Sequence, residues 1–266
     1  MLDAEARKEK NLLSFRNLLD SSLPSCQYVA SIAASSTVAS LRLEPVDVIR
    51  WSGLESAVKN HRLNLASDFL DLTPPRDFKE WLQATYEFAS EERLHYIFES
   101  TACMALNLLF NSSIVTEKPE NNRISPISNE GSRRADFISR RNEIADRKVD
   151  AKATTVWELK LDALRRHGVD LVACYKSEQS ACTIVREAIY QIVGYHVSSN
   201  CKYGFISTYS CTWATYLSTS GVLHISRPFY ATSRGPSSFL NMAHYVIQLA
   251  NGELNDASIC NVTLNT

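Results

Sequence analysis

The chain of 266 residues carries 28 Lys and Arg against 29 Asp and Glu, a formal net charge of −1. This length allows one large domain or a catalytic core with a smaller partner, and 45% hydrophobic residues suffice for a packed core, which excludes wholesale disorder. The near-zero charge excludes a globally basic nucleic-acid binder, so any basic footprint must be local.

Neither a membrane span nor a secretory leader is predicted. No apolar run approaches the length of a membrane span, and residues 1–10 are charged rather than signal-like. The seven cysteines show no C-x-x-C spacing and lie mostly in apolar patterns, which favours buried free thiols over a disulfide framework or a zinc site. These features predict an intracellular protein, nuclear or cytoplasmic, with no membrane partner.

The first third of the chain is predicted to be a helical region. An apolar stripe indicates an amphipathic helix over residues 2–20, residues 29–46 fit either a helix or strands, and residues 47–72 suggest one or two short helices. No residue in this part points to a chemistry. We therefore assign residues 1–84 to an N-terminal helical region and residues 85–266 to the functional domain.

A long helix is predicted over residues 77–110, because apolar residues recur at helical spacing in its second half. Its opposite side carries Glu92, His95 and Glu99, which share one face. A solvated polar stripe is the simpler interpretation, and a histidine there is more often satisfied than a ligand. The functional interpretation is that Glu99, nearer the middle of the packed part, points over the sheet toward further acids.

Three strands are expected next, at residues 111–115, 134–138 and 156–162. The second carries Asp136. In the third, Glu158 and Lys160 alternate with apolar residues and therefore project from the same face. Two carboxylates can hold a divalent cation through oxygen ligands, and an amine beside them can orient a water or stabilise charge on a phosphate. The pattern predicts phosphodiester hydrolysis.

The residues around the second strand form the most basic part of the chain. Arg134 precedes Asp136, and further arginines and Lys148 follow it. A charge run is usually a solvated loop, but this one flanks the proposed site, which favours contacts between its arginines and phosphates. Asp146 and Asp150 also lie here, without the apolar alternation of a strand, and rank below Asp136 as ligands.

The remaining elements alternate between helix and strand. A helix from about residue 180 carries Gln191 and Tyr195 one turn apart. Strands are expected at residues 203–209, 211–217 and 222–225, and a terminal helix at residues 237–250. This order predicts an α/β fold with a central mixed β-sheet flanked by helices.

The order of these elements and of their polar residues resembles the PD-(D/E)XK nuclease superfamily, the restriction-endonuclease-like fold. The segment Gln191-Ile192-Val193-Gly194-Tyr195 is similar to the Gln-x-x-x-Tyr element of its RecB and lambda-exonuclease-like branch. The resemblance covers about residues 90–230. Ala135 stands where the superfamily's name has a proline, at a position that varies within it.

The resemblance implies Mg²⁺- or Mn²⁺-dependent hydrolysis of nucleic acid, with DNA favoured over RNA. The implied metal ligands are Asp136, Glu158, the carbonyl of Leu159 and Glu99. The implied substrate-binding residues are Gln191, Tyr195 and Arg134, while Lys160 would assist the attacking water. Endonuclease or exonuclease action stays open, as does a homodimer.

A narrower resemblance is carried by residues 202–209 and the following Thr212-Trp213. This segment is similar to one in nuclease-like domains of fungal proteins, including those of the Crinkler type and those fused to kinase-like domains. It implies a eukaryotic intracellular protein with a kinase-like partner domain outside this chain. The chain itself has no Gly-rich loop before a lysine strand, no H-R-D and no D-F-G, so it is not predicted to be a kinase.

Two alternatives stay open. The first is a nuclease fold used as a module that binds nucleic acid or a partner protein without hydrolysis. The retained acids argue against it, because two carboxylates facing one site repel each other unless a cation or a proton is present. The second is an RNA endonuclease of the cap-snatching kind, in which a helix histidine joins the acids. His95 is its support in this sequence.

Overall fold

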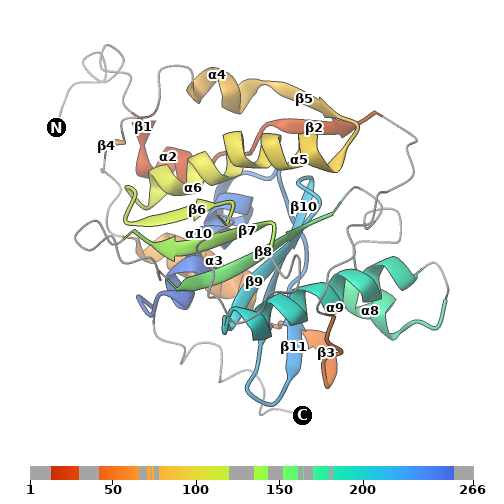
Figure 1. Cartoon of the computed structure of the whole chain (residues 1–266). Helices are drawn as coiled ribbons and strands as arrows, with labels where there is room; N and C mark the ends of the chain where they lie inside the picture. Colours follow the sequence, from red (N-terminus) through yellow and green to blue (C-terminus); the bar gives the residue numbers. More distant parts are fainter. Residues whose placement is uncertain are drawn as a thin grey trace.

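A mixed β-sheet flanked by helices on both faces organises the protein (Figure 1). The computed structural model describes residues 13–29, 42–65, 71–72, 74, 78–119, 135–142, 152–160, 164, 170–179 and 182–254. The predicted α/β class with a central mixed sheet is confirmed. Among the described residues, no helix is both long and apolar enough to cross a membrane.

Eight strands form the large sheet within the described part of the chain. They are β3 (Asp47–Arg50), β6 (Ile114–Glu117), β7 (Phe137–Arg141), β8 (Ala153–Leu159), β9 (Tyr203–Ser207), β10 (Cys211–Leu217), β11 (Val222–Ile225) and β12 (Phe229–Tyr230). Their order is β3-β11-β10-β9-β8-β7-β6, with β12 paired to β10. The β6-β7-β8 segment is antiparallel, whereas β8 runs parallel to β9 and β11 runs parallel to β3.

Two smaller strand pairs lie outside this sheet. Strand β1 (Leu13–Ser14) pairs antiparallel with β4 (Asp71–Leu72), and β2 (Ser25–Tyr28) pairs parallel with β5 (Thr85–Phe88). The described α-helices are α2 (Phe15–Leu19), α3 (Leu54–Asn64), α4 (Phe78–Gln83), α5 (Glu91–Phe98), α6 (Met104–Leu109), α8 (Leu171–Lys176), α9 (Thr183–Ser198) and α10 (Phe239–Ala250). A π-helical turn (Glu99–Cys103) joins α5 to α6, and a 3₁₀ turn, η3 (Gly235–Ser237), precedes α10.

The two faces of the sheet bury separate hydrophobic cores, because side chains alternate along each strand. On β8, Trp157 and Leu159 belong to the core that packs against α3, α5, α6 and α10. Val156, the residue before Trp157, points to the opposite face and belongs to the core beneath α8 and α9. Helix α9 lies between β8 and β9 in the chain and packs on both strands, so it is the crossover that makes them parallel.

A glycine permits the close approach of β8, β9 and α9. A Cβ at Gly204 of β9 would lie 2.8 Å from the Val156 carbonyl oxygen and 3.0 Å from Cε1 of His196. The His196 ring is buried and is held by Nδ1 to the Cys201 carbonyl at 2.8 Å and by Nε2 to the Thr215 hydroxyl at 2.9 Å. His196 therefore anchors the end of α9 to the sheet.

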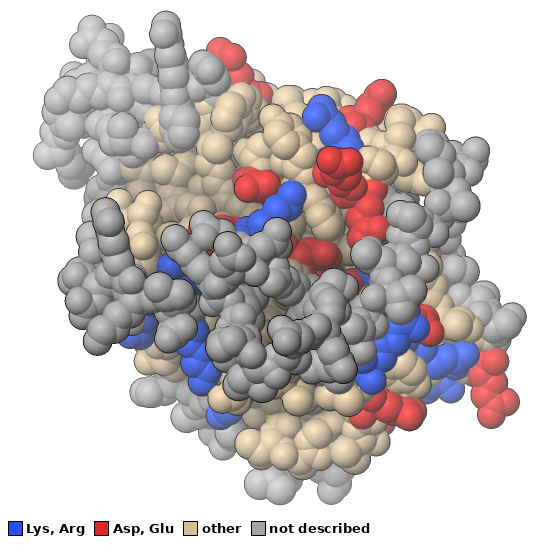
Figure 2. Space-filling view, in the orientation of Figure 1, with Lys and Arg blue, Asp and Glu red and all other residues tan. Residues whose placement is uncertain are grey.

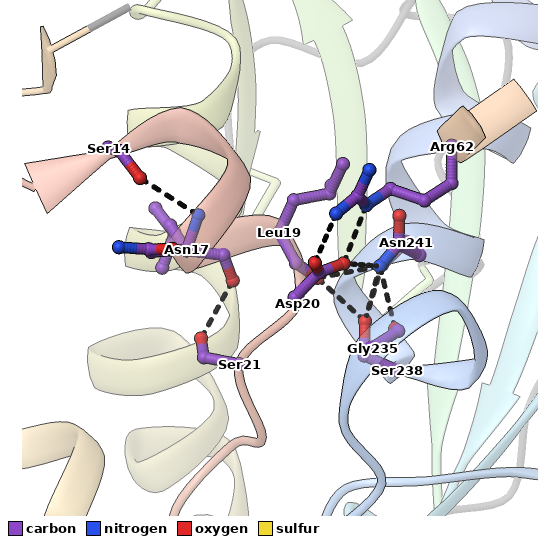
Figure 3. Close-up of polar contacts among 10 residues, drawn as sticks. Ser14, Asn17, Leu19, Asp20, Ser21, Arg62, Gly235, Ser238 and Asn241 are labelled. Atoms are coloured by element: carbon purple, nitrogen blue, oxygen red, sulfur yellow. Dashed lines mark hydrogen bonds and ion pairs between the residues drawn. The ribbon is translucent and has the colours of Figure 1, made fainter. Parts of the chain in front are cut away.

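A polar network ties the beginning of the described chain to its last helix (Figure 3). Asp20, after α2, forms an ion pair with Arg62 of α3, and its carboxylate accepts a hydrogen bond of 3.0 Å from Asn241 of α10. The Asn241 amide also donates to the carbonyls of Leu19 and Gly235, both at 2.9 Å. This network joins α2, α3 and α10, which are far apart in sequence and pack on the same face of the sheet.

Several predicted elements are confirmed, and others are corrected. Strands β10 and β11 have the predicted bounds, and α10 lies within the predicted terminal helix. The predicted helix over residues 77–110 is wrong at β5, because Thr85, Tyr86 and Phe88 are β-branched and aromatic residues that pair with β2. Helix α8 was not predicted, because it has only six residues and lies in a polar segment, where no helical period of apolar residues can be recognised.

The N-terminal third contains strands as well as helices. Of the helix predicted over residues 2–20, residues 1–12 lie outside the described chain, and only α2 is helical in the rest. The segment Asp47–Arg50, expected to be helical, is the edge strand β3 of the large sheet. The division at residue 84 stays a prediction, although one hydrophobic core draws residues from both sides of it.

The expectation that all cysteines are free thiols is also wrong. Cys174 in α8 and Cys182, just before α9, form a disulfide. They are eight positions apart in sequence, and their Cα atoms lie 5.5 Å apart. Cys26, Cys103, Cys201 and Cys211 keep their thiols. Sequence spacing alone does not report this proximity, because it depends on how α8 packs on α9.

Candidate metal centre and active site

The candidate site lies where β7 begins and β8 ends. Because these strands are antiparallel, Asp136, the residue before β7, lies beside the end of β8. The Asp136 N–H donates to the Trp157 carbonyl at 3.0 Å, and the Leu159 N–H donates to Oδ2 of Asp136 at 2.7 Å. The carboxylate therefore caps the end of the strand pair in a fixed orientation.

Strand β8 contributes the acid of the E-x-K motif, and Lys160, directly after the strand, contributes the amine. The Glu158 side chain is buried, and its Oε1 forms an ion pair with Nζ of Lys160. Its Oε2 is also buried and has no hydrogen-bond partner within the described chain. The Lys160 N–H donates to the Ser207 carbonyl of β9 at 2.8 Å, which fixes the backbone from which the amine extends.

Helix α5 contributes a histidine and a second acid. Nε2 of His95 lies 3.6 Å from Oδ1 of Asp136 and 4.0 Å from Oε1 of Glu91, one turn earlier on the same helix. This nitrogen is buried and has no hydrogen-bond partner among the described residues. One ligand atom each from Glu91, His95 and Asp136 lie within 4.8 Å of one another, so this group could hold a metal ion.

The electrostatics of the site favour a cation. Burial raises the pKa of Asp136 well above its usual range. Burial also raises the pKa of Glu158, and the nearby charge of Asp136 raises it further, although the Lys160 ammonium opposes this shift. Burial lowers the pKa of His95, which leaves its imidazole neutral at neutral pH. Two buried carboxylates and a neutral imidazole are costly without a positive charge between them.

The donor set fits a divalent cation. Carboxylate oxygens are the ligands of Mg²⁺ and Mn²⁺, and an imidazole nitrogen is better tolerated by Mn²⁺ than by Mg²⁺. Two of the buried polar atoms without a hydrogen-bond partner among the described residues, Glu158 Oε2 and His95 Nε2, belong to residues that interact with Asp136. Buried polar atoms usually have a partner, so these two atoms are suited to bind a cation or a water at this place.

Glu99 lies outside this group. Its carboxylate pairs with Nζ of Lys118 at 3.7 Å, and half of its side chain is exposed. Glu99 is the first residue of the π-helical turn, which changes the helical phase after α5. Glu91 takes part in the group although it was not predicted to do so. Glu91 is four residues before His95, a spacing that places both side chains on one helical face. The spacing of Glu92 and Glu99 from His95 fits such a face equally well, so the sequence did not single out Glu91.

The remaining predicted residues are Gln191, Tyr195 and Arg134. Gln191 and Tyr195 are buried residues of α9, which packs against β8 and β9. Burial and then the charges of Glu158 and Asp136 raise the pKa of Tyr195, so its hydroxyl is near both acids. Arg134 lies outside the described residues, and its role as a phosphate-binding residue stays a prediction.

The described arginines of the basic segment have partners within the protein. Arg140 pairs with Glu117 at 2.7 Å, and Arg141 donates to the Asn251 carbonyl at 2.7 Å. Asp146 and Asp150, the rival acids, are outside the described chain. In Figure 2, acidic side chains gather in the upper half of the molecule, with lysine or arginine side chains between them.

Comparison with known proteins does not indicate a family or a function for this chain. No protein-family model, curated protein or solved structure matches it. The assignment therefore depends on Asp136, Glu158 and Lys160, and on the group that Glu91 and His95 complete.

Proposed function

We propose that this protein is a metal-dependent nuclease with a restriction-endonuclease-like core, which hydrolyses phosphodiester bonds at the end of β8. One observation carries the proposal. The buried carboxylate of Glu158 and the largely buried carboxylate of Asp136 come from adjacent antiparallel strands to one place, and the ammonium of Lys160 is bound to Glu158. Acids and an amine in this arrangement are what metal-assisted phosphodiester hydrolysis requires.

The chain order supports the same class. A helical segment, α5 to α6, is followed by the antiparallel strands β6, β7 and β8, the crossover helix α9 and the parallel strand β9. Asp136 and Glu158 occupy the second and third of these strands or their ends, and Tyr195 occupies the crossover helix. This is the order on which the resemblance to PD-(D/E)XK nucleases was based.

The residues around Asp136 would hold the cation. Glu91 and His95 are available on the α5 side, and Glu158 with the carbonyl of Leu159 on the β8 side. Bound Mg²⁺ or Mn²⁺ would supply Lewis-acid activation of a phosphate and of an attacking water. The Leu159 N–H holds Oδ2 of Asp136, which leaves Oδ1 on the side of His95.

Lys160 would act on the substrate rather than on the cation. Its ammonium is tethered by Glu158 and is about four-fifths buried, so it is held in one place with little solvent screening. A charge held in this way can stabilise the negative charge that builds up on a phosphate, or orient the attacking water. Tyr195, near Glu158, and Gln191 would then hold the substrate backbone from α9.

The position of His95 supports a second candidate substrate. DNA is the substrate favoured by the resemblance to the RecB and lambda-exonuclease-like branch. An RNA endonuclease of the cap-snatching kind instead joins a helix histidine to the acids, and His95 lies beside Asp136 as that arrangement requires. A module without hydrolysis is disfavoured, since burying two carboxylates together has a cost that only a cation or a proton relieves.

The experiment that tests the proposal is cleavage of labelled single- and double-stranded DNA and RNA in Mg²⁺, Mn²⁺ or EDTA. The intact chain is compared with Glu158→Ala/Lys160→Ala and with Lys176→Ala, an exposed lysine of α8. Metal-dependent cutting by the intact chain and by Lys176→Ala, lost in the double variant, is expected. Absence of cutting on all four substrates by a folded protein would favour the module without hydrolysis.

A further inference from the structure

A second lysine stands beside the candidate centre. Lys118 follows directly after β6, which is antiparallel to β7 with Glu117 opposite Ile138. The end of β6 therefore meets the beginning of β7, where Asp136 lies. Lys160 follows β8, the neighbour of β7 on its other side. Asp136 thus has a lysine on each flanking strand.

The contacts of Lys118 hold its ammonium on the α5 side of the sheet. Nζ lies 5.8 Å from the ring centroid of Phe137, and the edge of the same ring contacts His95. Nζ is also 3.7 Å from Oε2 of Glu99. Lys118, Phe137 and His95 are therefore neighbours, and His95 in turn lies beside Asp136. Its side chain is 44% exposed and open to a ligand from solvent.

The placement of this charge is difficult to explain by stability. An ion pair between half-exposed side chains, such as Lys118 with Glu99, contributes little to folding. Beside a cation site, an ammonium also weakens binding of the cation by repulsion. The position is favourable if an anion binds there, because a phosphate next to the metal would be attracted by the cation and by the ammonium together.

We propose that Lys118 is a phosphate-binding residue of this site, positioned by Glu99, and that Lys118 and Lys160 receive adjoining parts of a nucleic-acid backbone on the two sides of Asp136. The inference rests on the proposed nuclease function and adds to it. Glu99, expected from the sequence to be a metal ligand, acts here as a positioning residue through Lys118.

The test measures binding of labelled single- and double-stranded DNA and RNA in EDTA and in Ca²⁺, over a range of NaCl concentrations. The variants are Lys118→Met, Lys118→Arg and Glu99→Gln. Lys176→Met is the matched control. Lys176, the last residue of α8, is 52% exposed and pairs with Asp47 of β3 at 3.6 Å. Helix α8 packs on the opposite face of the sheet from α5. The Mn²⁺ dependence of the melting temperature is measured for each variant without nucleic acid.

Lys118→Met is expected to weaken nucleic-acid binding about tenfold and to lower the salt slope by about one phosphate contact. It should also reach half of its Mn²⁺ stabilisation at an about threefold lower Mn²⁺ concentration, because a repelling charge is gone. Lys118→Arg should keep most of the affinity, Glu99→Gln should lose part of it, and Lys176→Met should match the intact chain.

Two results would overturn the inference, and they are distinguishable. If the intact chain binds nucleic acid and Lys118→Met has the affinity and salt slope of Lys176→Met, Lys118 is a surface ion-pair residue and the nuclease proposal survives. If the intact chain binds none of the four nucleic acids in EDTA or Ca²⁺, the proposed function fails and the role of Lys118 fails with it.

Discussion

Oδ2 of Asp136 accepts a hydrogen bond of 2.7 Å from the backbone N–H of Leu159. This bond joins the residue before β7 to the last residue of β8 and fixes the orientation of the carboxylate. Its other oxygen, Oδ1, is 3.6 Å from Nε2 of His95. The Asp136 side chain therefore connects the paired ends of β7 and β8 to α5.

Asp136→Asn should remove cleavage and metal binding without unfolding the protein. The amide oxygen can still accept the Leu159 N–H, so the strand pair stays closed. The charge that would hold the cation is lost, and the melting temperature should no longer rise with Mn²⁺, because only binding to the folded state stabilises it. Differential scanning fluorimetry with and without Mn²⁺ checks this. Asp47→Asn is a control acid on β3, and a retained Mn²⁺ response in Asp136→Asn would exclude Asp136 as a ligand.

The metal-free protein should become less stable as the pH rises from mildly acidic to mildly alkaline. Burial raises the pKa of Asp136 and Glu158 in the folded chain, so it binds protons more tightly than the unfolded chain. Their contribution to stability is fully present below the unfolded-state pKa values of about 4 and is lost as the pH rises through the folded-state values. Asp136→Asn/Glu158→Gln should lack this loss.

Urea unfolding in EDTA at several pH values measures the difference. Relative to the double variant, the intact chain should lose about 1 to 3 kcal/mol of unfolding free energy between about pH 5 and pH 8. Adding Mn²⁺ should reverse the loss, because the cation binds the ionised carboxylates and is favoured at high pH. Parallel pH profiles for the two proteins in EDTA would contradict the raised pKa values.

His95→Ala should alter metal choice more than metal dependence. The imidazole is a ligand that Mn²⁺ accepts more readily than Mg²⁺, and burial keeps it neutral at neutral pH. We expect the ratio of Mn²⁺- to Mg²⁺-supported cleavage to fall about tenfold in the variant. His224→Ala, at a half-buried histidine of β11, is the matched control. An unchanged ratio would place His95 outside the metal site and weaken the case for a cap-snatching type of enzyme.

Arg62→Met should destabilise the fold and leave the chemistry intact. The carboxylate of Asp20, which pairs with Arg62, would lose that ion pair and keep the hydrogen bond from Asn241. Burial raises the pKa of Asp20, but the hydrogen bonds from Arg62 and Asn241 outweigh it and hold that pKa below its usual value. We expect a loss of about 2 kcal/mol of unfolding free energy at neutral pH, since the pair is partly buried. Urea unfolding measures it, and a change below about 0.5 kcal/mol would show that the network is dispensable.

Reduction of the Cys174–Cys182 disulfide should lower stability locally. The bond closes a short loop between α8 and α9, so its removal is expected to cost roughly 2 kcal/mol. Urea unfolding of the intact chain with and without dithiothreitol measures the change. Cys174→Ser/Cys182→Ser should match the reduced protein, whereas a mass spectrum showing two free thiols in the oxidised sample would contradict the pairing.

The sequence by itself determined the local elements that carry the chemistry. Alternation fixed Glu158 and Lys160 on one face of a strand, and β-branched and aromatic runs located β10 and β11, because side-chain period and propensity are local properties. The α/β class also followed from the order of elements. The sequence misplaced β5, which lies within an apparent helical pattern. The strand conformation of β5 depends on pairing with β2, which is distant in sequence.

Only the tertiary structure decided which helix residues reach the acids. Glu91, Glu92 and Glu99 are each compatible with a helical face that includes His95, and choosing among them requires the rotation of α5 about its axis and the position of the π-helical turn. Packing of Phe98 and Leu94 into the core sets that rotation, which brings Glu91 to Asp136 and turns Glu99 toward Lys118. Long-range packing, which no local period records, therefore completed the site.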